Sequence, residues 1–184
     1  MKAIYKKELQ SYFHSFLGPL FIGAFLLLLG IYFAVYDLFM GYPYIGYALS
    51  SVTFLFLIAI PVLCMKILAE ERHQKTDQLI LTSPVSVTGI VLGKFLALAT
   101  IFAIPVGLVS LYPVVMSFFG AVDIGKSYLA VFGFLLYGLA SIAVCVFISS
   151  LTESQVIAAV VSFGVLFLGY IVNGLCSMIS STGN

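Results

Sequence analysis

Five apolar stretches, separated by short polar segments, make up most of the chain. They cover residues 16–36, 47–68, 90–119, 127–149 and 154–179. A helix needs about 20 consecutive apolar residues to cross the hydrocarbon core of a bilayer, and each stretch is long enough. The pattern predicts an all-α polytopic membrane protein whose residues 1–184 form a single transmembrane domain.

Prolines predict where these helices depart from straight rods. The third stretch is too long for one straight crossing and contains Pro105 and Pro113, each of which removes an intrahelical hydrogen bond. We therefore expect a kink near Ile104 and a short helical piece beyond it. Pro61 should bend the second stretch in the same way, whereas Pro19 lies in a first helical turn, where its missing N–H costs nothing.

A different pattern precedes the first stretch, over residues 1–15. Apolar side chains recur there at helical spacing, while basic and polar side chains occupy the other face. Such a pattern is typical of an amphipathic helix that lies along a membrane surface. The two faces are defined by Lys6, Lys7, Leu9, Tyr12 and Phe13. A frayed N-terminal extension of the first span is the alternative interpretation.

Composition excludes a soluble domain. Hydrophobic residues make up 62% of the chain and charged residues 8%, whereas an ordinary globular domain is about one-quarter charged. The basic residues are divided between short flanks and form no stripe, so the sequence predicts no nucleic-acid partner. The lipid bilayer is the partner that the composition implies.

The positions of the basic residues predict the orientation. Most of them precede the first span or flank the connection between the second and third spans: Lys2, Lys6, Lys7, Lys66, Arg72, Lys75 and Lys94. The opposite connections contain only Lys126. Because cytoplasmic loops carry the excess of Lys and Arg, we expect the N-terminus inside and, after five crossings, the C-terminus outside.

The segment 69–88 is the one sizeable polar piece after the N-terminal helix. Glu71 and Lys75 have the favourable i,i+4 spacing of a short helix, and Pro84 should end that helix. Leu79 and Leu81 supply apolar groups there with no lipid nearby to cover them. Two interpretations stay open: a partner protein covers them, or they pack against the ends of the spans.

One run of residues carries a resemblance to a known family. The run consists of Glu71-Arg72, Thr76, Leu79, Leu81, Ser83-Pro84, Gly89 and Gly93-Lys94. It resembles the segment between the second and third helices of ABC-2 type transporter permeases. The resemblance implies a cytoplasmic coupling loop that docks on an ATP-binding subunit. The contact residues that it implies are Glu71, Arg72, Thr76, Asp77, Leu79, Leu81 and Pro84.

Two further segments extend this resemblance. Residues 149–159 are similar to the short inner turn between spans four and five in the gliding-motility-type branch, and the N-terminal helix resembles its interfacial helix. Such permeases usually have six spans, whereas five are expected here. We therefore expect either a fragment or a shortened member that lacks the sixth span.

ATP chemistry is expected on another polypeptide. The nearest approach to a phosphate-binding loop begins at Gly89, but it has one residue too few between its glycines, and Phe95 stands where Ser or Thr is required. We interpret Gly89 and Gly93 as a small-xxx-small pair that lets helices approach closely. Lys94 is expected to snorkel toward the cytoplasmic headgroups.

The sequence indicates no catalytic or metal-binding site. The three cysteines, Cys64, Cys145 and Cys176, are far apart along the chain and have no nearby His, so they suggest packing residues instead of metal ligands or a disulfide. No Asp, Glu, Lys or Arg is expected deep inside a span, which argues against an ion-coupled pump. We expect no enzyme activity and no cofactor on this chain, with ATP bound by the partner subunit.

The leading functional hypothesis is the permease subunit of an ATP-binding cassette transporter in the bacterial plasma (inner) membrane. The expected partners are the ATP-binding subunit and a second permease chain, as a homo- or heterodimer. A secondary transporter or channel is the alternative, although matching interrupted helices are not evident. The third hypothesis is a non-transport membrane scaffold or an intramembrane enzyme. An enzyme needs convergent catalytic groups, and no such set is recognisable in the sequence.

Overall fold

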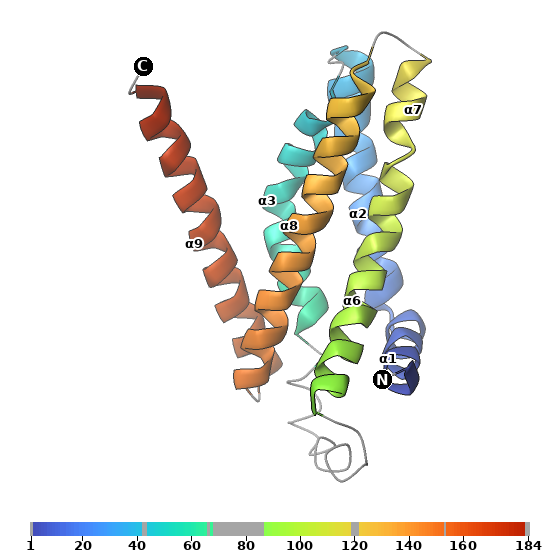
Figure 1. Ribbon diagram of the computed structural model, residues 1–184, viewed down its shortest axis with the longest axis vertical. Helices are drawn as coiled ribbons and strands as arrows, with labels where there is room; N and C mark the ends of the chain where they lie inside the picture. Colours follow the sequence, from blue (N-terminus) through green and yellow to red (C-terminus); the bar gives the residue numbers. More distant parts are fainter. Residues whose placement is uncertain are drawn as a thin grey trace.

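The computed structural model describes residues 2–41, 44–65, 67, 87–118, 122–152 and 154–182. For residues 2, 3, 87 and 173–182 it describes the backbone only. Every regular element in these ranges is helical (Figure 1). The elements are α1 Lys2–His14, α2 Leu17–Phe33, the π-helix η1 Ala34–Phe39, α3 Gly46–Cys64, α6 Val87–Val109, α7 Tyr112–Ser117, α8 Ile124–Leu151 and α9 Gln155–Thr182.

Five of these helical segments are long and apolar enough to cross a membrane, within the described ranges. They are Leu17–Phe39, Gly46–Cys64, Thr88–Ser117, Ile124–Leu151 and Gln155–Val172. Large apolar side chains such as Leu27, Leu136 and Val160 are exposed on their outer surfaces. A surface of this kind is stable against lipid but not against water. The predicted all-α membrane fold with five spans is therefore confirmed.

An aromatic cluster joins four of the spans. Phe25 of α2, Phe56 of α3, Phe102 of α6 and Phe134 of α8 contact one another in every combination, with ring centroids 5.0 to 6.4 Å apart. All four rings are buried. Aromatic pairs at such distances add about 0.5–1.5 kcal/mol each beyond their burial. The cluster therefore fixes how α2, α3, α6 and α8 pack together.

The third span is interrupted between Val109 and Tyr112. The helix continues through Pro105, ends at Val109 and is followed by α7 after Ser110 and Leu111. The predicted short outer piece is confirmed, and the kink near Ile104 stays a prediction, since the helix runs unbroken through that position. Pro113 explains its position, because a helical residue 113 would bond its N–H to the carbonyl of Val109 and proline has no N–H.

The first span also differs from the expected boundaries. It continues past Tyr36 as the π-helix Ala34–Phe39, and Gly41 follows with a positive φ of 71°. A left-handed residue after a helix is most easily glycine, which has no Cβ to clash. The π-helix brings Asp37 into the buried part of the bundle.

The N-terminal helix α1 is a separate element and not an extension of the first span. The chain leaves the helix at Ser15 and Phe16, and Gly18 at the start of α2 lies so close to the carbonyl of Tyr12 that a Cβ would contact it. In Figure 1, α1 lies beside the lower end of α6. The interpretation as a frayed extension is therefore wrong, while the location of α1 at a membrane surface stays a prediction.

The last helix leans away from the other spans. Figure 1 shows that α9 approaches α8 at the turn between them and diverges from it toward the C-terminus. No phenylalanine of α9 takes part in the cluster that joins the other four spans. The divergence opens a cleft between α9 and the pair α3 and α8.

Candidate functional site

A buried lysine connects three elements near the segment 68–86. The Nζ atom of Lys94, on α6, donates a hydrogen bond to the carbonyl oxygen of Ile67 at 2.6 Å and lies 3.4 Å from Oε1 of Glu8 on α1. Lys94 is 0% exposed and Glu8 is 8% exposed. The expectation that Lys94 snorkels to the headgroups is therefore wrong, because its ammonium group finds partners inside the protein.

Two tyrosines of α1 add further polar contacts to the same junction. The hydroxyl of Tyr12 donates to the carbonyl of Leu63 at 3.0 Å, and the hydroxyl of Tyr5 lies 3.0 Å from Oγ1 of Thr100 on α6. We call Tyr5, Glu8, Tyr12, Ile67 and Lys94 the basal junction. It connects α1 to α6 and to the C-terminal end of α3.

The basal junction satisfies backbone groups that a helix end leaves free. The last carbonyls of a helix have no intrahelical partner and carry partial negative charge. Leu63 lies in the final turn of α3, and Ile67 lies in the turn that follows it. The Tyr12 hydroxyl and the Lys94 ammonium group supply the missing donors. The last described residue before segment 68–86 is thus bonded to α6, the helix into which that segment leads.

The predicted docking residues lie outside the described residues. These are Glu71, Arg72, Thr76, Asp77, Leu79, Leu81 and Pro84. Their role at a contact with an ATP-binding subunit therefore stays a prediction. What the structure describes is the base of their segment, where Ile67 and the start of α6 meet.

The residues predicted for the N-terminal helix divide between two environments. Lys6, Lys7 and Phe13 are exposed, Leu9 is partly buried and Tyr12 is buried. The apolar face therefore packs largely against protein, while Phe13 remains on the surface. The sequence pattern missed Glu8, whose signal was a carboxylate on the same face as Tyr5 and Tyr12.

The predicted glycine pair lies at the beginning of α6. Gly93 is buried and Gly89 is partly buried. Burial of Gly93 agrees with close helix packing, although the role of the pair stays a prediction. Another close contact involves Gly138 of α8, where a Cβ would collide with the ring of Phe102 on α6.

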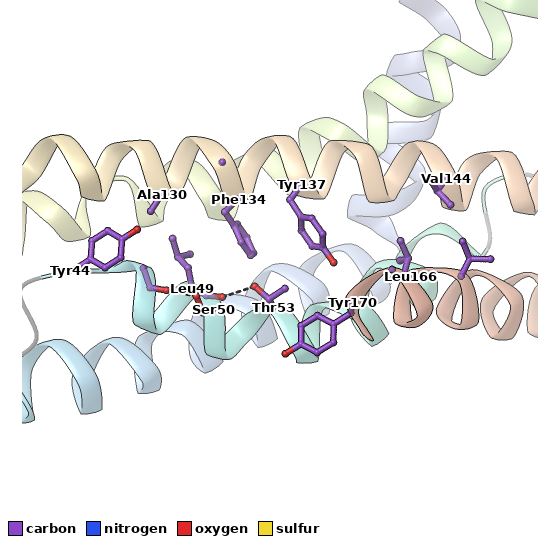
Figure 2. A pocket seen from close by; sticks show the side chains of 14 residues that line it. Tyr44, Leu49, Ser50, Thr53, Ala130, Phe134, Tyr137, Val144, Leu166 and Tyr170 are labelled. Atoms are coloured by element: carbon purple, nitrogen blue, oxygen red, sulfur yellow. Dashed lines mark hydrogen bonds between the residues drawn. The ribbon is translucent and has the colours of Figure 1, made fainter. Parts of the chain in front are cut away.

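The cleft beside α9 is the candidate ligand site. It encloses about 640 Å³ between α3, α8 and α9. Figure 2 shows Tyr137 of α8 facing Thr53 of α3 and Tyr170 of α9 across this space, with Tyr44 at one end. The hydroxyls of Ser50 and Thr53 donate to backbone carbonyls four residues earlier, at 2.7 and 2.8 Å, so their oxygens remain able to accept.

The cleft combines these hydroxyl groups with an apolar wall. Leu49, Phe134, Val165 and Leu166 line it together with the tyrosines. A second hollow of about 190 Å³ between α2 and α3 is lined entirely by apolar side chains and alanine. A site that orients a ligand needs a few convergent polar groups as well as apolar surface. The cleft beside α9 meets this requirement, and the second hollow does not.

Asp37 is a buried carboxylate that the sequence analysis did not single out. It is 7% exposed, and neither of its oxygens has a hydrogen-bond partner among the described residues. Its signal in the sequence was an acidic residue directly after an apolar stretch. Both Asp37 and Lys94 lie toward the ends of their spans, Leu17–Phe39 and Thr88–Ser117, so the middle of these spans still carries no charge.

The cysteines do not form a disulfide in the described part of the chain. Cys64 of α3 and Cys145 of α8 are buried free thiols that lie next to each other. This proximity is not recognisable from the sequence, because the two residues belong to different spans. No group of three or more potential metal ligands occurs among the described side chains.

Comparisons with known proteins place the chain in a family. A family model described as "ABC-2 family transporter protein" matches residues 35–183. Comparisons with curated proteins and with solved structures gave no match. The matched range includes four complete spans and the segment that contains the predicted docking residues. The chain therefore belongs to the ABC-2 transporter family, whose members are membrane permeases of ABC transporters.

Proposed function

We propose that this chain is the membrane-spanning permease subunit of an ATP-binding cassette transporter, driven by a separate ATPase subunit. The family match over residues 35–183 is the observation that carries the proposal. The absence of a phosphate-binding loop from the sequence agrees with ATP hydrolysis on another chain. The ATPase contacts segment 69–88, and ATP binds to that partner.

The proposed assembly contains a second permease chain, identical or related, in the bacterial plasma (inner) membrane. The distribution of Lys and Arg supports an N-terminus on the cytoplasmic side. This orientation puts segment 69–88 on the side where ATP is available.

The proposed substrate path includes the cleft beside α9. Its apolar wall and the hydroxyls of Tyr44, Thr53, Tyr137 and Tyr170 suit an amphipathic molecule, with its polar part near the tyrosines. A conformational change in α9 relative to α3 and α8 changes the width of this cleft, since α9 lies outside the aromatic cluster.

Co-purification tests the proposed partnership. The tagged chain, extracted in mild detergent, is expected to carry an ATP-binding subunit with it. The double substitution Leu79→Asp and Leu81→Asp should abolish this association, because two charges cannot enter an apolar contact without large desolvation costs. Gln74→Asp is the matched control, since it adds charge to the same segment outside the predicted contact. A complex retained by the double variant contradicts docking at these leucines.

A further inference from the structure

The contacts of the basal junction bear on how a movement of segment 68–86 is transmitted to α6 and α1. Segment 68–86 starts directly after Ile67 and leads into α6. Lys94 belongs to α6 and binds the carbonyl of Ile67, so one side chain joins the residue before the segment to the helix that follows it. The same ammonium group contacts Glu8, which adds α1 to the connection.

We propose that Lys94 is a positioning residue that couples segment 68–86 to α1. It holds the base of the segment closed, so that a displacement of the segment moves α6 and α1 together. The inference rests on the proposed function, because the displacement comes from the ATPase subunit. Through Tyr5, Glu8 and Tyr12, α1 is bonded to both α6 and α3 and follows their relative movement.

A purely structural role explains the junction less well. Burying a lysine and a glutamate costs desolvation energy, and an apolar pair of similar volume is often as stable or more stable. What an apolar pair cannot do is bind the Ile67 carbonyl at 2.6 Å and a side chain of α1 from the same atom. Charge-assisted hydrogen bonds are directional, so they transmit a displacement to defined partners.

Labelling of α1 in the complete complex tests the proposal. Ser11, which is exposed on α1, is replaced by Cys as the single reporter in a Cys176→Ser background, while the buried Cys64 and Cys145 remain. The rate of reaction with a water-soluble maleimide is measured without nucleotide and after trapping with ATP and vanadate. The complex used is the full chain with the ATP-binding subunit that co-purifies with it.

The ratio of the two rates is the result that matters. With Lys94 intact, we expect the labelling rates of the nucleotide-free and the trapped complex to differ by at least about fivefold. This factor is the lower end of the typical coupling between two sites of an allosteric protein. Lys94→Met should bring the ratio close to one, whereas Lys94→Arg should keep it, because the guanidinium group can donate to both partners. Lys126→Met is the matched control and should behave as the parent, since Lys126 is exposed and pairs with Asp123.

Each outcome bears on one hypothesis. If no ATP-binding subunit co-purifies with the parent chain, the proposed function fails. If the subunit co-purifies but the ratio is already one in the parent, or stays fivefold in Lys94→Met, the inference about Lys94 is overturned. If Lys94→Met does not fold, Glu8→Ala decides instead: it removes the acceptor for Lys94 on α1, and an unchanged ratio overturns the inference.

Discussion

Lys94 and Asp37 show two ways in which this chain buries an ionisable group. Lys94 has the Ile67 carbonyl and Glu8 as partners, so its charge is compensated. Asp37 has no partner for either carboxylate oxygen among the described residues. An unsatisfied buried polar group costs about 1–3 kcal/mol, and more when it is charged. Within the described part of the chain, Asp37 is therefore a local source of instability in the first span.

Replacing Asp37 by Leu should stabilise the isolated chain. The substitution removes a buried carboxylate that has no hydrogen-bond partner among the described residues and keeps the number of side-chain heavy atoms, so we expect a gain of about 1–3 kcal/mol. Thermal unfolding in detergent measures it, with Asp37→Asn expected to give a smaller gain. Lys6→Met is the control, since it removes a charge at an exposed position of α1 and should shift the midpoint little. A loss of stability in Asp37→Leu means that the carboxylate has a partner in the folded protein.

The sequence located Lys94 correctly at the start of a span but not its environment. Snorkelling was expected because a lysine near a helix end usually reaches water. The preferred partners, Glu8 and the carbonyl of Ile67, lie 86 and 27 residues away along the chain. Helical periodicity describes one helix at a time, so it cannot show which residue of another helix will face a given position.

At the scale of the elements, proline position decides where the third span breaks. Pro105 and Pro113 each remove one backbone hydrogen bond, yet the helix continues through the first and ends at Val109 because of the second. After Val109 the hydroxyl of Ser110 donates to the carbonyl of Gly107 at 2.6 Å and helps to close the helix end. The sequence predicts two helical pieces. It does not show which of the two prolines ends the first piece, because that depends on the hydrogen bonds formed locally.

Close packing of α6 and α8 makes Gly138 sensitive to substitution. A Cβ there would collide with the ring of Phe102, which is held by the rings of Phe25, Phe56 and Phe134. We expect Gly138→Ala to destabilise the chain by about 1–3 kcal/mol, the usual cost of overpacking. Chemical denaturation in mixed micelles measures the effect.

Gly133→Ala on the same helix is the matched control. A Cβ at Gly133 meets no atom within 4 Å, so the substitution should be neutral or gain up to about 1 kcal/mol in helix propensity. Equal effects of the two substitutions contradict the close approach of α6 and α8.

The beginning of α8 should depend on pH. The carboxylate of Asp123 caps this helix by accepting a hydrogen bond from the backbone N–H of Lys126, and it pairs with the Lys126 ammonium group at 2.9 Å. These bonds to Lys126 lower the pKa of Asp123 below its ordinary value of 3.8. The stabilisation is therefore present above pH 3.8 and is lost as the pH falls through the lowered pKa.

Asp123→Asn isolates this dependence, because the amide can still cap the helix but does not titrate. We expect the wild-type chain to unfold at a higher temperature than the variant near neutral pH, with the difference vanishing in strong acid. Melting curves at several pH values measure the difference. A difference that is constant with pH argues against an ionised Asp123 in the cap.

The whole molecule combines a joined group of four spans with one span that diverges. The number, order and approximate limits of the five spans could be predicted, because apolar length alone determines them. The cleft beside α9 could not, since it depends on the angle between helices and not on the composition of any one of them. Its polar side chains come from α3, α8 and α9 and from Tyr44, just before α3, and they are separated in sequence by apolar runs.

A single tryptophan can test whether this cleft is filled with water or with lipid. The chain contains no Trp, so an introduced one is a unique fluorophore. Gly133 lines the cleft and Gly107 is exposed on α6, and a Cβ at either position meets no atom within 4 Å. Both glycines can therefore be replaced by Trp without a clash at the Cβ.

A water-accessible path predicts opposite quenching at the two sites. In bilayer nanodiscs, Gly133→Trp should be quenched more by acrylamide, since the hydroxyls of Thr53, Tyr137 and Tyr170 favour hydration of the cleft. Gly107→Trp should be quenched more by brominated acyl chains, since it points outward from a span. If brominated lipid quenches both equally, acyl chains occupy the cleft, and the substrate path must then be sought elsewhere in the assembled transporter.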